Sequence, residues 1–228
     1  MFTHIKKRFS IPKLEAINVG GKRFYKYQDR FYPSVTSVVS SINDKGIDEW
    51  RLKVGEDLAN YIKETSSGIG DEFHEICNEY LKNKLSDKHV NIFPLAHFQN
   101  IRHHLDRINN IYALEKELFS CELELAGKTD CIAEFDGTPS IIDFKTSKKS
   151  KDESWIESYF LQTACYSFMW KELTGLDFPQ IIIIISGADG SSCVFIKHRD
   201  EYMSRVYQVR AEWEDLYREL IDKAYGRT

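Results

Sequence analysis

Long apolar stretches are absent from this 228-residue sequence, and their absence bounds what the chain can be. The longest wholly apolar run covers residues 181–185, far short of the roughly 20 residues that cross a bilayer as a helix. The basic residues Lys6, Lys7 and Arg8 are not followed by the apolar stretch of a secretory signal, although a short or trimmed transit peptide would fit them. We therefore expect no membrane segment.

Cysteine is too scarce and too scattered for a disulfide framework or a metal cluster. No two of the five cysteines form a CxxC pair, so the ligand spacing of zinc and iron–sulfur sites is missing. We expect free, mostly buried thiols in a reducing compartment. They are Cys77, Cys121, Cys131, Cys165 and Cys193.

Positive charge is not in excess, because 31 Lys and Arg residues face 35 Asp and Glu residues, a net charge of -4. Proteins that bind nucleic acid over a broad surface usually carry a surplus of cations. Any DNA-binding groove must therefore be local. The composition, 42% hydrophobic and 29% charged, is typical of a globular protein with its own core, and the length suits one domain covering residues 1–228.

The first half of the chain is predicted to be mainly helical. Alternating aromatic residues at 22–32 indicate a hairpin with its turn at Gln28 and Asp29, and Pro33 and Ser34 then begin the helical part, about 33–110. Helical periodicity covers residues 35–41, 48–64, 70–85 and 93–110, with Gly46, Gly68 and Pro94 as the expected breaks.

The second half, about 111–228, changes to the period of two that is typical of strands. An amphipathic helix at 154–173 should separate a strand meander from a wholly apolar strand at 181–185, which is expected to be central because both of its faces must be covered. The predicted class is α/β with α+β character: a central mixed β-sheet flanked by helices. The meander strands are 118–125, 128–135 and 140–144, with turns at 126–127 and 136–137, and a strand at 193–197 and a helix to about Tyr225 close the chain.

Two acids and a lysine lie on adjacent strands of the predicted meander. Asp143 and Lys145 are two residues apart on one strand and so project from the same face, and Asp130 lies on the strand before. Ionisable residues among buried apolar neighbours need a compensating partner, and a metal site supplies one. The neighbours are Ile132, Ile141, Ile142 and Phe144.

The residue types suit a hard divalent cation. Asp130 and Asp143 offer carboxylate oxygens and the Phe144 backbone carbonyl can add a third ligand, which leaves Lys145 to face a scissile phosphate. The alternative is that Asp143 and Lys145 form an ion pair at a sheet edge while Asp130 caps a turn. An isolated Asp-x-Lys is usually such a surface pair.

The combination resembles the RecB-type branch of the PD-(D/E)XK nucleases, in which an acid follows a small or glycine turn and a hydrophobic strand ends in (D/E)-x-K. Mitochondrial genome maintenance exonucleases and bacteriophage RecB-like exonucleases look most similar. The resemblance spans about residues 33–220, with PSVT at 33–36 and GDEFHE at 70–75, and implies a restriction-endonuclease-like core. One departure is Thr129, which stands where proline would precede the acid; this branch tolerates that change.

The resemblance also implies roles for residues outside the central segment. His74 is expected as a further metal ligand or phosphate contact, although a lone helical histidine is more often structural. Gln162 and Tyr166 match a Q-x3-Y signature on one helical face, near the lysine or the DNA, with helix packing as the alternative. Either Glu115 or Glu117 should orient the site, and the sequence does not choose between them.

A basic run follows the predicted catalytic strand in a loop at 146–153. Such a run is usually a solvated face, but its position favours phosphate guidance, because local positive charge steers a polyanion even to an acidic protein. Trp155, Tyr159 and Phe160 are candidates for base stacking, with core packing as the alternative. The predicted DNA-binding residues are Thr146, Ser147, Lys148 and Lys149.

The function that the resemblance implies is a magnesium-dependent DNA exonuclease, with manganese able to substitute, that prefers single-stranded ends and acts in replication, recombination or repair. No iron–sulfur cluster is expected, and no Walker phosphate loop is present. A structure-specific or duplex-processing nuclease and an inactive DNA-binding module of the same fold remain alternatives. We expect a monomer, with replication or recombination proteins as candidate partners, in the cytoplasm of a bacterial or phage-infected cell or in mitochondria.

Overall fold

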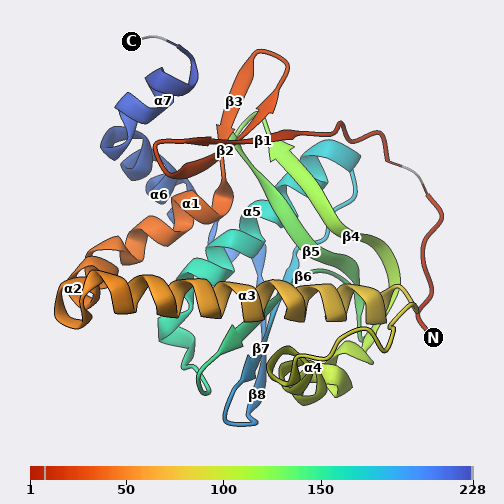
Figure 1. Cartoon of the computed structure of the whole chain (residues 1–228). Coiled ribbons are helices and arrows are strands. Elements are labelled where there is room, and N and C mark those ends of the chain that lie inside the picture. The colour runs from red at the N-terminus through yellow and green to blue at the C-terminus, as the bar shows by residue number, and fades with distance from the viewer. Residues whose placement is uncertain (8, 227–228) are drawn as a thin grey trace.

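A mixed five-stranded sheet forms the centre of the protein (Figure 1). The computed structural model describes residues 1–7 and 9–226. The strands are ordered β4-β5-β6-β7-β8, and only the β6–β7 pair is parallel, because helix α5 connects these two strands as a crossover. Their bounds are β4 Ile108–Ser120, β5 Leu125–Phe135, β6 Thr138–Ser147, β7 Gln180–Gly187 and β8 Ser192–His198.

Helices cover both faces of this sheet. The isoleucines of β7 alternate between two cores, with Ile181 and Ile183 packed toward α5 (Glu157–Thr174) and Ile182 and Ile184 packed toward the other face. That other face is covered by α3 (Glu56–Leu81) and α4 (Ile92–Leu105). The prediction of an α/β, restriction-endonuclease-like fold with a mixed sheet flanked by helices is confirmed, and β7 is an interior strand as expected.

The helix that separates the meander from β7 lies where it was predicted, but it is buried on almost every side. The prediction that it is amphipathic was therefore wrong. Between Ser158 and Trp170 of α5, Tyr159 and Phe168 alone are not fully buried. The sheet covers one side of α5, and α1 (Val35–Ser40) and α6 (Met203–Leu216) cover another. Buried polar residues on α5, such as Gln162, therefore need hydrogen-bond partners inside the protein.

The first strand of the meander differs most from its prediction. Strand β4 begins at Ile108, and α4 ends at Leu105, where the helical pattern was expected to run to residue 110. A register shift between Asn109 and Ala113 interrupts the alternation, so period two was not readable there. The expected turn at 126–127 lies inside β5. A side-chain carbon at Gly127 would lie 2.7 Å from the Tyr166 hydroxyl, so this glycine permits close packing and makes no turn.

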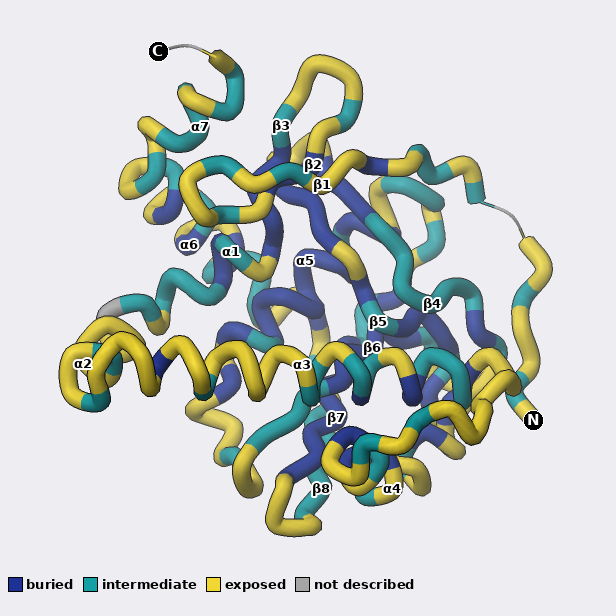
Figure 2. The backbone as a smooth tube through the Cα atoms, in the orientation of Figure 1, coloured by how far each residue is buried: buried dark blue, intermediate teal, exposed yellow. Residues whose placement is uncertain are grey.

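The helical first half has a different break from those predicted. Helices α2 (Asp44–Val54) and α3 meet at Gly55, whose φ of 89° suits glycine, while Gly46 and Gly68 lie inside helices. Pro94 lies in the first turn of α4, where its missing N–H costs little. The first half of α3 is mostly exposed, as Figure 2 shows. It therefore lacks the periodic apolar residues that would have shown in the sequence that one helix continues through Gly68.

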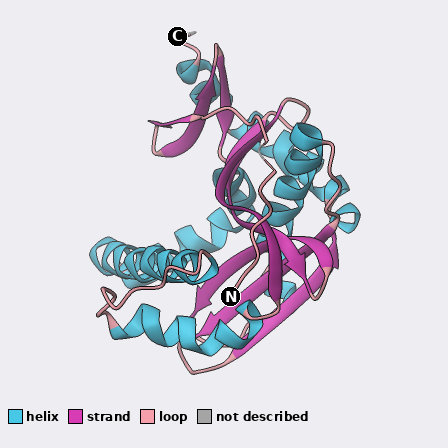
Figure 3. Ribbon diagram, turned by 90° about the vertical axis from the view of Figure 1, so that its right-hand side faces the viewer, coloured by secondary structure: helices cyan, strands magenta, loops and turns pink. Residues whose placement is uncertain are grey.

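A second, three-stranded antiparallel sheet precedes the helices. It consists of β1 (Glu15–Val19), which was not predicted, and the predicted hairpin β2 (Lys22–Tyr27) and β3 (Arg30–Pro33). In the turned view of Figure 3 this small sheet stands apart from the larger one, near the C-terminal end. The closing helix is two helices, α6 and α7 (Arg218–Ala224), which meet at Tyr217. Among the described residues, short 3-10 turns are also found at Ser41–Asn43, Glu153–Trp155 and Arg199–Glu201.

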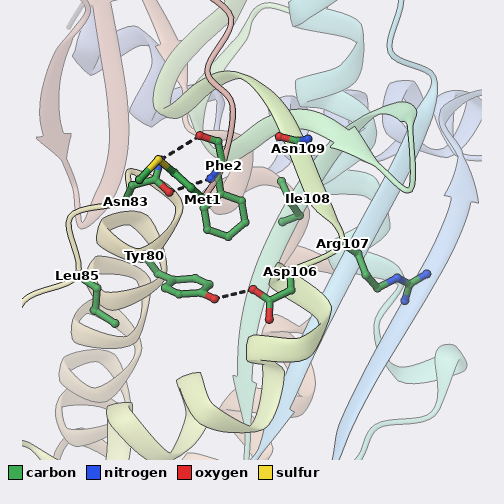
Figure 4. Close-up of a pocket in the computed structure, with 9 residues that line it drawn as sticks. All are labelled: Met1, Phe2, Tyr80, Asn83, Leu85, Asp106, Arg107, Ile108 and Asn109. Atoms are coloured by element: carbon green, nitrogen blue, oxygen red, sulfur yellow. Dashed lines mark hydrogen bonds between the residues drawn. The ribbon is translucent and has the colours of Figure 1, made fainter.

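The N-terminal segment is held along the edge of β4. The Ile5 N–H donates to the Ile111 carbonyl at 2.8 Å, and Asn83 bonds both the N–H and the carbonyl of Phe2, at 2.8 and 3.0 Å. Figure 4 shows the Asn83–Phe2 hydrogen bonds beside the Tyr80–Asp106 hydrogen bond. These residues line a cavity of about 570 Å³. All five cysteines are free, and no helix among the described residues has the length and hydropathy of a membrane span.

Candidate active site

A second cavity, of about 580 Å³, brings together residues from both halves of the chain. Helix α3 forms one wall, and β4, β5 and β6 meet there with α5, α1 and the small sheet. Its lining residues are Arg23, Thr36, Asp71, His74, Glu75, Asn78, Glu115, Lys128, Asp130, Lys145 and Gln162. It is named the cavity from here on.

The acids of the site form one row across the sheet. The β4–β5 register sets Glu115 across from Asp130, and the β5–β6 register, continued by one residue, sets Asp130 across from Asp143. At this row the β5–β6 ladder ends, and the Phe144 N–H donates instead to Asp130 Oδ2 at 2.8 Å. The neighbouring strands thus place three carboxylates side by side because their side chains share one face.

Asp143 is 1% exposed on a strand in the interior of the sheet, so it does not form the edge-strand surface pair considered above. Gln162 Nε2 donates to its Oδ1 at 2.8 Å, and Lys145 Nζ lies 2.6 Å from its Oδ2, an ion pair without hydrogen-bond geometry. Burial raises the pKa of Asp143 to about 6; Lys145 opposes this rise and Asp130 adds to it. Burial alone would lower the pKa of Lys145, but its attraction to Asp143 and Asp130 raises it.

Asp130 is held between α3 and β6. His74 Nδ1 lies 3.3 Å from Asp130 Oδ1, and one donor atom from each of His74, Glu115 and Asp130 lies within 4.8 Å of the others. Burial alone would raise the pKa of Asp130, but His74, Lys145 and the Phe144 N–H together lower it. For His74, burial is outweighed by the attraction to Asp130, and its pKa is raised. The surroundings of Asp130 therefore favour its ionised form more than those of Asp143 do.

The structure distinguishes the two candidate glutamates. Glu115 lines the cavity and forms an ion pair with Lys128, whereas Glu117 accepts a hydrogen bond from the Leu14 N–H at 3.2 Å, away from the lining residues. Glu115 also has a positive φ of 50°, a backbone conformation that costs energy for a residue with a side chain. Strain retained beside the acids favours Glu115 as the supporting glutamate.

Gln162 and Tyr166 occupy different positions although they share a helix face. Gln162 lines the cavity and holds Asp143, as described above. Tyr166 is 1% exposed and packs on Gly127 and toward Thr36, so it lies behind the cavity wall. In this structure Tyr166 is placed to support β5 and not to meet a strand of DNA.

The basic run begins inside β6, because that strand extends to Ser147, and the predicted loop therefore starts later than expected. Thr146 lies beside Gly70 of α3, and Lys148 and Lys149 are exposed. Further along, Tyr159 lies between two cations, with Lys145 Nζ 5.2 Å and Lys151 Nζ 5.0 Å from its ring centre. Trp155 is 66% exposed, and Phe160 is 1% exposed in the core, so packing is the role of Phe160.

Some residues of the cavity were missed in the sequence. Lys128 precedes Asp130 by two on one strand, and Asn78 follows His74 by four on one helix, so both spacings could have identified them. Asn78 Oδ1 is buried with no hydrogen-bond partner among the described residues. Arg23 comes from β2, and nothing in the pattern of that hairpin indicates its distant neighbours.

The residues fit a hard divalent cation. The donor set of His74, Glu115 and Asp130 is rich in oxygen, which magnesium and manganese prefer, and the unpartnered Asn78 Oδ1 adds a neutral oxygen to the same cavity. Another acidic group with donors this close, Glu75, Glu79 and His89, differs because Lys88 forms ion pairs with both of its glutamates at 2.7 and 2.8 Å.

Comparisons with known proteins identify the family of this chain. The family model described as the PD-(D/E)XK nuclease superfamily matches residues 43–226. Mitochondrial genome maintenance exonuclease 1 of Homo sapiens is 30% identical over 182 residues, covering 72% of this chain and 52% of the relative. The protein of the same name from Mus musculus is 28% identical over 130 residues, covering 52% of this chain and 38% of the relative.

The chain thus spans about half the length of the human relative and less of the mouse one. The crystal structure of SSO0001 aligns with a TM-score of 0.41 and 14% sequence identity, covering 87% of this chain and 86% of that one. Nucleases of the matched superfamily generally use divalent metal ions. Because the family model covers most of the sequence, the chain belongs to the PD-(D/E)XK nuclease superfamily.

Proposed function

We propose that this nuclease is a magnesium-dependent DNA exonuclease that hydrolyses phosphodiester bonds and prefers single-stranded ends. The observation that carries the proposal is the ion pair between buried Asp143 and half-buried Lys145 on an interior strand, beside Asp130 and open to the cavity through Lys145. A protein tolerates charged groups in its interior only where they are compensated or used. Phosphodiester hydrolysis uses all three.

Each residue has a separate part in the proposed mechanism. A divalent ion held by Asp130, Asp143 and the Phe144 carbonyl, with His74 or Glu115 beside them, would neutralise phosphate charge and lower the pKa of a water molecule. Lys145, held beside Asp143, stabilises the attacking water or the negative charge that grows in the transition state. Gln162 fixes the rotamer of Asp143 through its 2.8 Å hydrogen bond.

The names of the relatives support the finer parts of the proposal. Both are exonucleases of mitochondrial genome maintenance, which favours DNA as the substrate, cleavage from an end, and a place in DNA replication or repair. The same names favour a mitochondrial location over the bacterial or phage-infected cytoplasm. Action as a monomer and alongside replication or recombination proteins stays a prediction.

One assay tests the proposal. Single-stranded, duplex and flapped DNAs of one sequence, labelled at either end, are incubated with the purified protein and magnesium, manganese or EDTA. We expect mononucleotides or short products from single strands with either metal, and intact DNA in EDTA. Cleavage that is equal on all three DNAs contradicts the preference for single strands, and no cleavage of any of them contradicts the proposed exonuclease activity.

A further inference from the structure

The cavity carries charges of both signs on different elements. Helix α3 contributes the acids Asp71 and Glu75, of which Glu75 is paired with Lys88, whereas β2 contributes Arg23 and β5 contributes Lys128, which is paired with Glu115. A phosphate backbone entering the cavity is repelled by Asp71 and attracted by Arg23. Because the whole chain is acidic, with a net charge of -4, this local asymmetry decides on which side the backbone lies.

Of the cations that line the cavity, Arg23 is the one without a carboxylate partner. Lys145 is paired with Asp143 and Lys128 with Glu115. The Arg23 guanidinium, on an exposed residue, makes no ion pair or side-chain hydrogen bond with any residue that the structure describes. A guanidinium offers a planar set of donors that matches two phosphate oxygens, so a phosphate is the partner whose chemistry fits it.

The main chain of Arg23 is fixed relative to the acids. Its carbonyl accepts the Ser34 N–H at 2.9 Å, and Ser34 forms a bridge to Ala126 of β5, the strand that carries Asp130. The next residue, Phe24, is fully buried with its ring centre 6.1 Å from that of Trp213. The small sheet is thus anchored where it carries Arg23. A ligand bound by Arg23 would therefore lie at a fixed distance from the row of acids.

We propose that Arg23 binds a phosphate of the DNA strand adjacent to the scissile phosphate and holds the strand against the wall formed by β2 and β5. The inference rests on the proposed function, since it names a substrate contact of the same site. Residues 15–33 of the small sheet precede the region 43–226 that the family model matches, so this contact belongs to the chain's own N-terminal part.

The test measures how tightly protein variants bind a single-stranded oligonucleotide. Calcium replaces magnesium in the binding buffer, and the oligonucleotide is checked to be intact after each measurement. Arg23→Gln is compared with the wild type and with Arg30→Gln, which removes the same charge from β3 beside a different cavity. We expect Kd to rise on the order of tenfold for Arg23→Gln. The slope of log K against log salt should become shallower by about 0.7, the value for one phosphate contact on a single strand.

A merely structural role would not change that slope. Arg23→Lys should restore the slope but not the full affinity, because it keeps the charge and loses the bidentate geometry. If Arg23→Gln binds with wild-type affinity and slope, or if Arg30→Gln shows the same loss, the inference is wrong. Cleavage by the wild type in magnesium is measured separately. If the wild type binds the oligonucleotide but does not cleave it, the proposed exonuclease activity is contradicted, while the affinities of the Arg23 variants can still be compared.

Discussion

Asp143 occupies a position where a globular protein would normally place an apolar side chain. Its neighbours along β6, Ile142 and Phe144, are at most 2% exposed, and burial raises the pKa of its own carboxyl group to about 6. Lys145 and Gln162 compensate part of the cost of burial. Local rules of burial are expected to fail at functional sites, and here they fail at Asp143, which lies in one row with Asp130 and Glu115.

Replacing the central pair should abolish cleavage and leave the fold in place. Asp143→Asn and Lys145→Ala are each expected to lower the cleavage rate by at least about a hundredfold, because each removes a charge that the transition state needs. Circular dichroism should remain native, since apolar contacts on both faces of the sheet form the core. The matched control is Lys171→Ala on α5, which breaks an exposed ion pair with Asp177 and should cut normally. Wild-type rates in both site variants would refute the assignment.

His74 is expected to contribute less than the acids. His74→Ala should weaken activity without abolishing it, and a higher magnesium or manganese concentration should partly restore the rate, because the carboxylates remain in place. Activity across a metal titration is measured beside thermal unfolding, with His103→Ala on α4 as the control. A lower melting temperature with an unchanged metal curve would instead assign His74 to helix packing.

At the scale of elements, apolar pattern predicted the interior of the sheet well. The isoleucine run of β7 and the acid and lysine of β6 could be placed because both faces of an interior strand are buried and leave little choice of register. The resemblance then indicated His74 and Gln162, which the structure brings to the same cavity. Sequence spacing alone would have left both as helix-packing residues.

Elements that are less buried, or irregular, could not be predicted from their own sequence. The register shift in β4 hides its alternation, and the exposed first half of α3 carries too few buried positions to show that one helix continues through Gly68. The choice of Glu115 over Glu117 depends on that same irregular strand, where Glu115 has a positive φ. Arg23 reaches the cavity through tertiary packing of a distant hairpin, which no local pattern encodes.

The contact between α4 and β8 should make stability depend on pH. His104 Nε2 lies 3.2 Å from Ser192 Oγ, while Nδ1 is buried without a partner among the described residues. Burial, followed by His103 and Arg107, lowers the pKa of His104 to about 4. Because the unfolded chain binds this proton more readily, the stabilisation is complete above about pH 6.5 and is lost as pH falls toward 4.

Because solvent screens this partly exposed imidazole, we expect it to lower the free energy of unfolding by at most about 1 kcal/mol between pH 7 and pH 5. His104→Gln keeps an amide near Ser192 and removes the titration, so urea unfolding of this variant should lose that part of the pH dependence. His198→Gln, which changes an exposed histidine, should retain it. Identical pH dependence in the wild type and His104→Gln would show that His104 does not titrate differently on folding.

At the scale of the whole molecule, the site lies where separate parts of the chain meet. The large sheet supplies the acids and Lys145, α3 supplies His74 and an acidic wall, and the small sheet supplies Arg23. Figure 1 shows α3 crossing in front of the large sheet with the small sheet above it. We therefore expect substrate choice to be set by elements outside the row of Glu115, Asp130 and Asp143, since these elements limit what can reach it.

This arrangement, together with the proposed exonuclease activity, predicts dependence on a free single-stranded end. A strand that must pass between α3 and the small sheet enters most easily by its end, because a closed circle has to insert two strands at once. Linear single strands should be cut at least about tenfold faster than covalently closed circles of the same sequence, a difference of about 1.4 kcal/mol in activation free energy. Cutting each circle once with a separate enzyme should restore the rate, and Asp143→Asn should cut neither form. Equal rates on circles and linear strands would show that the strand reaches the acids without threading, and the preference for ends would then be wrong.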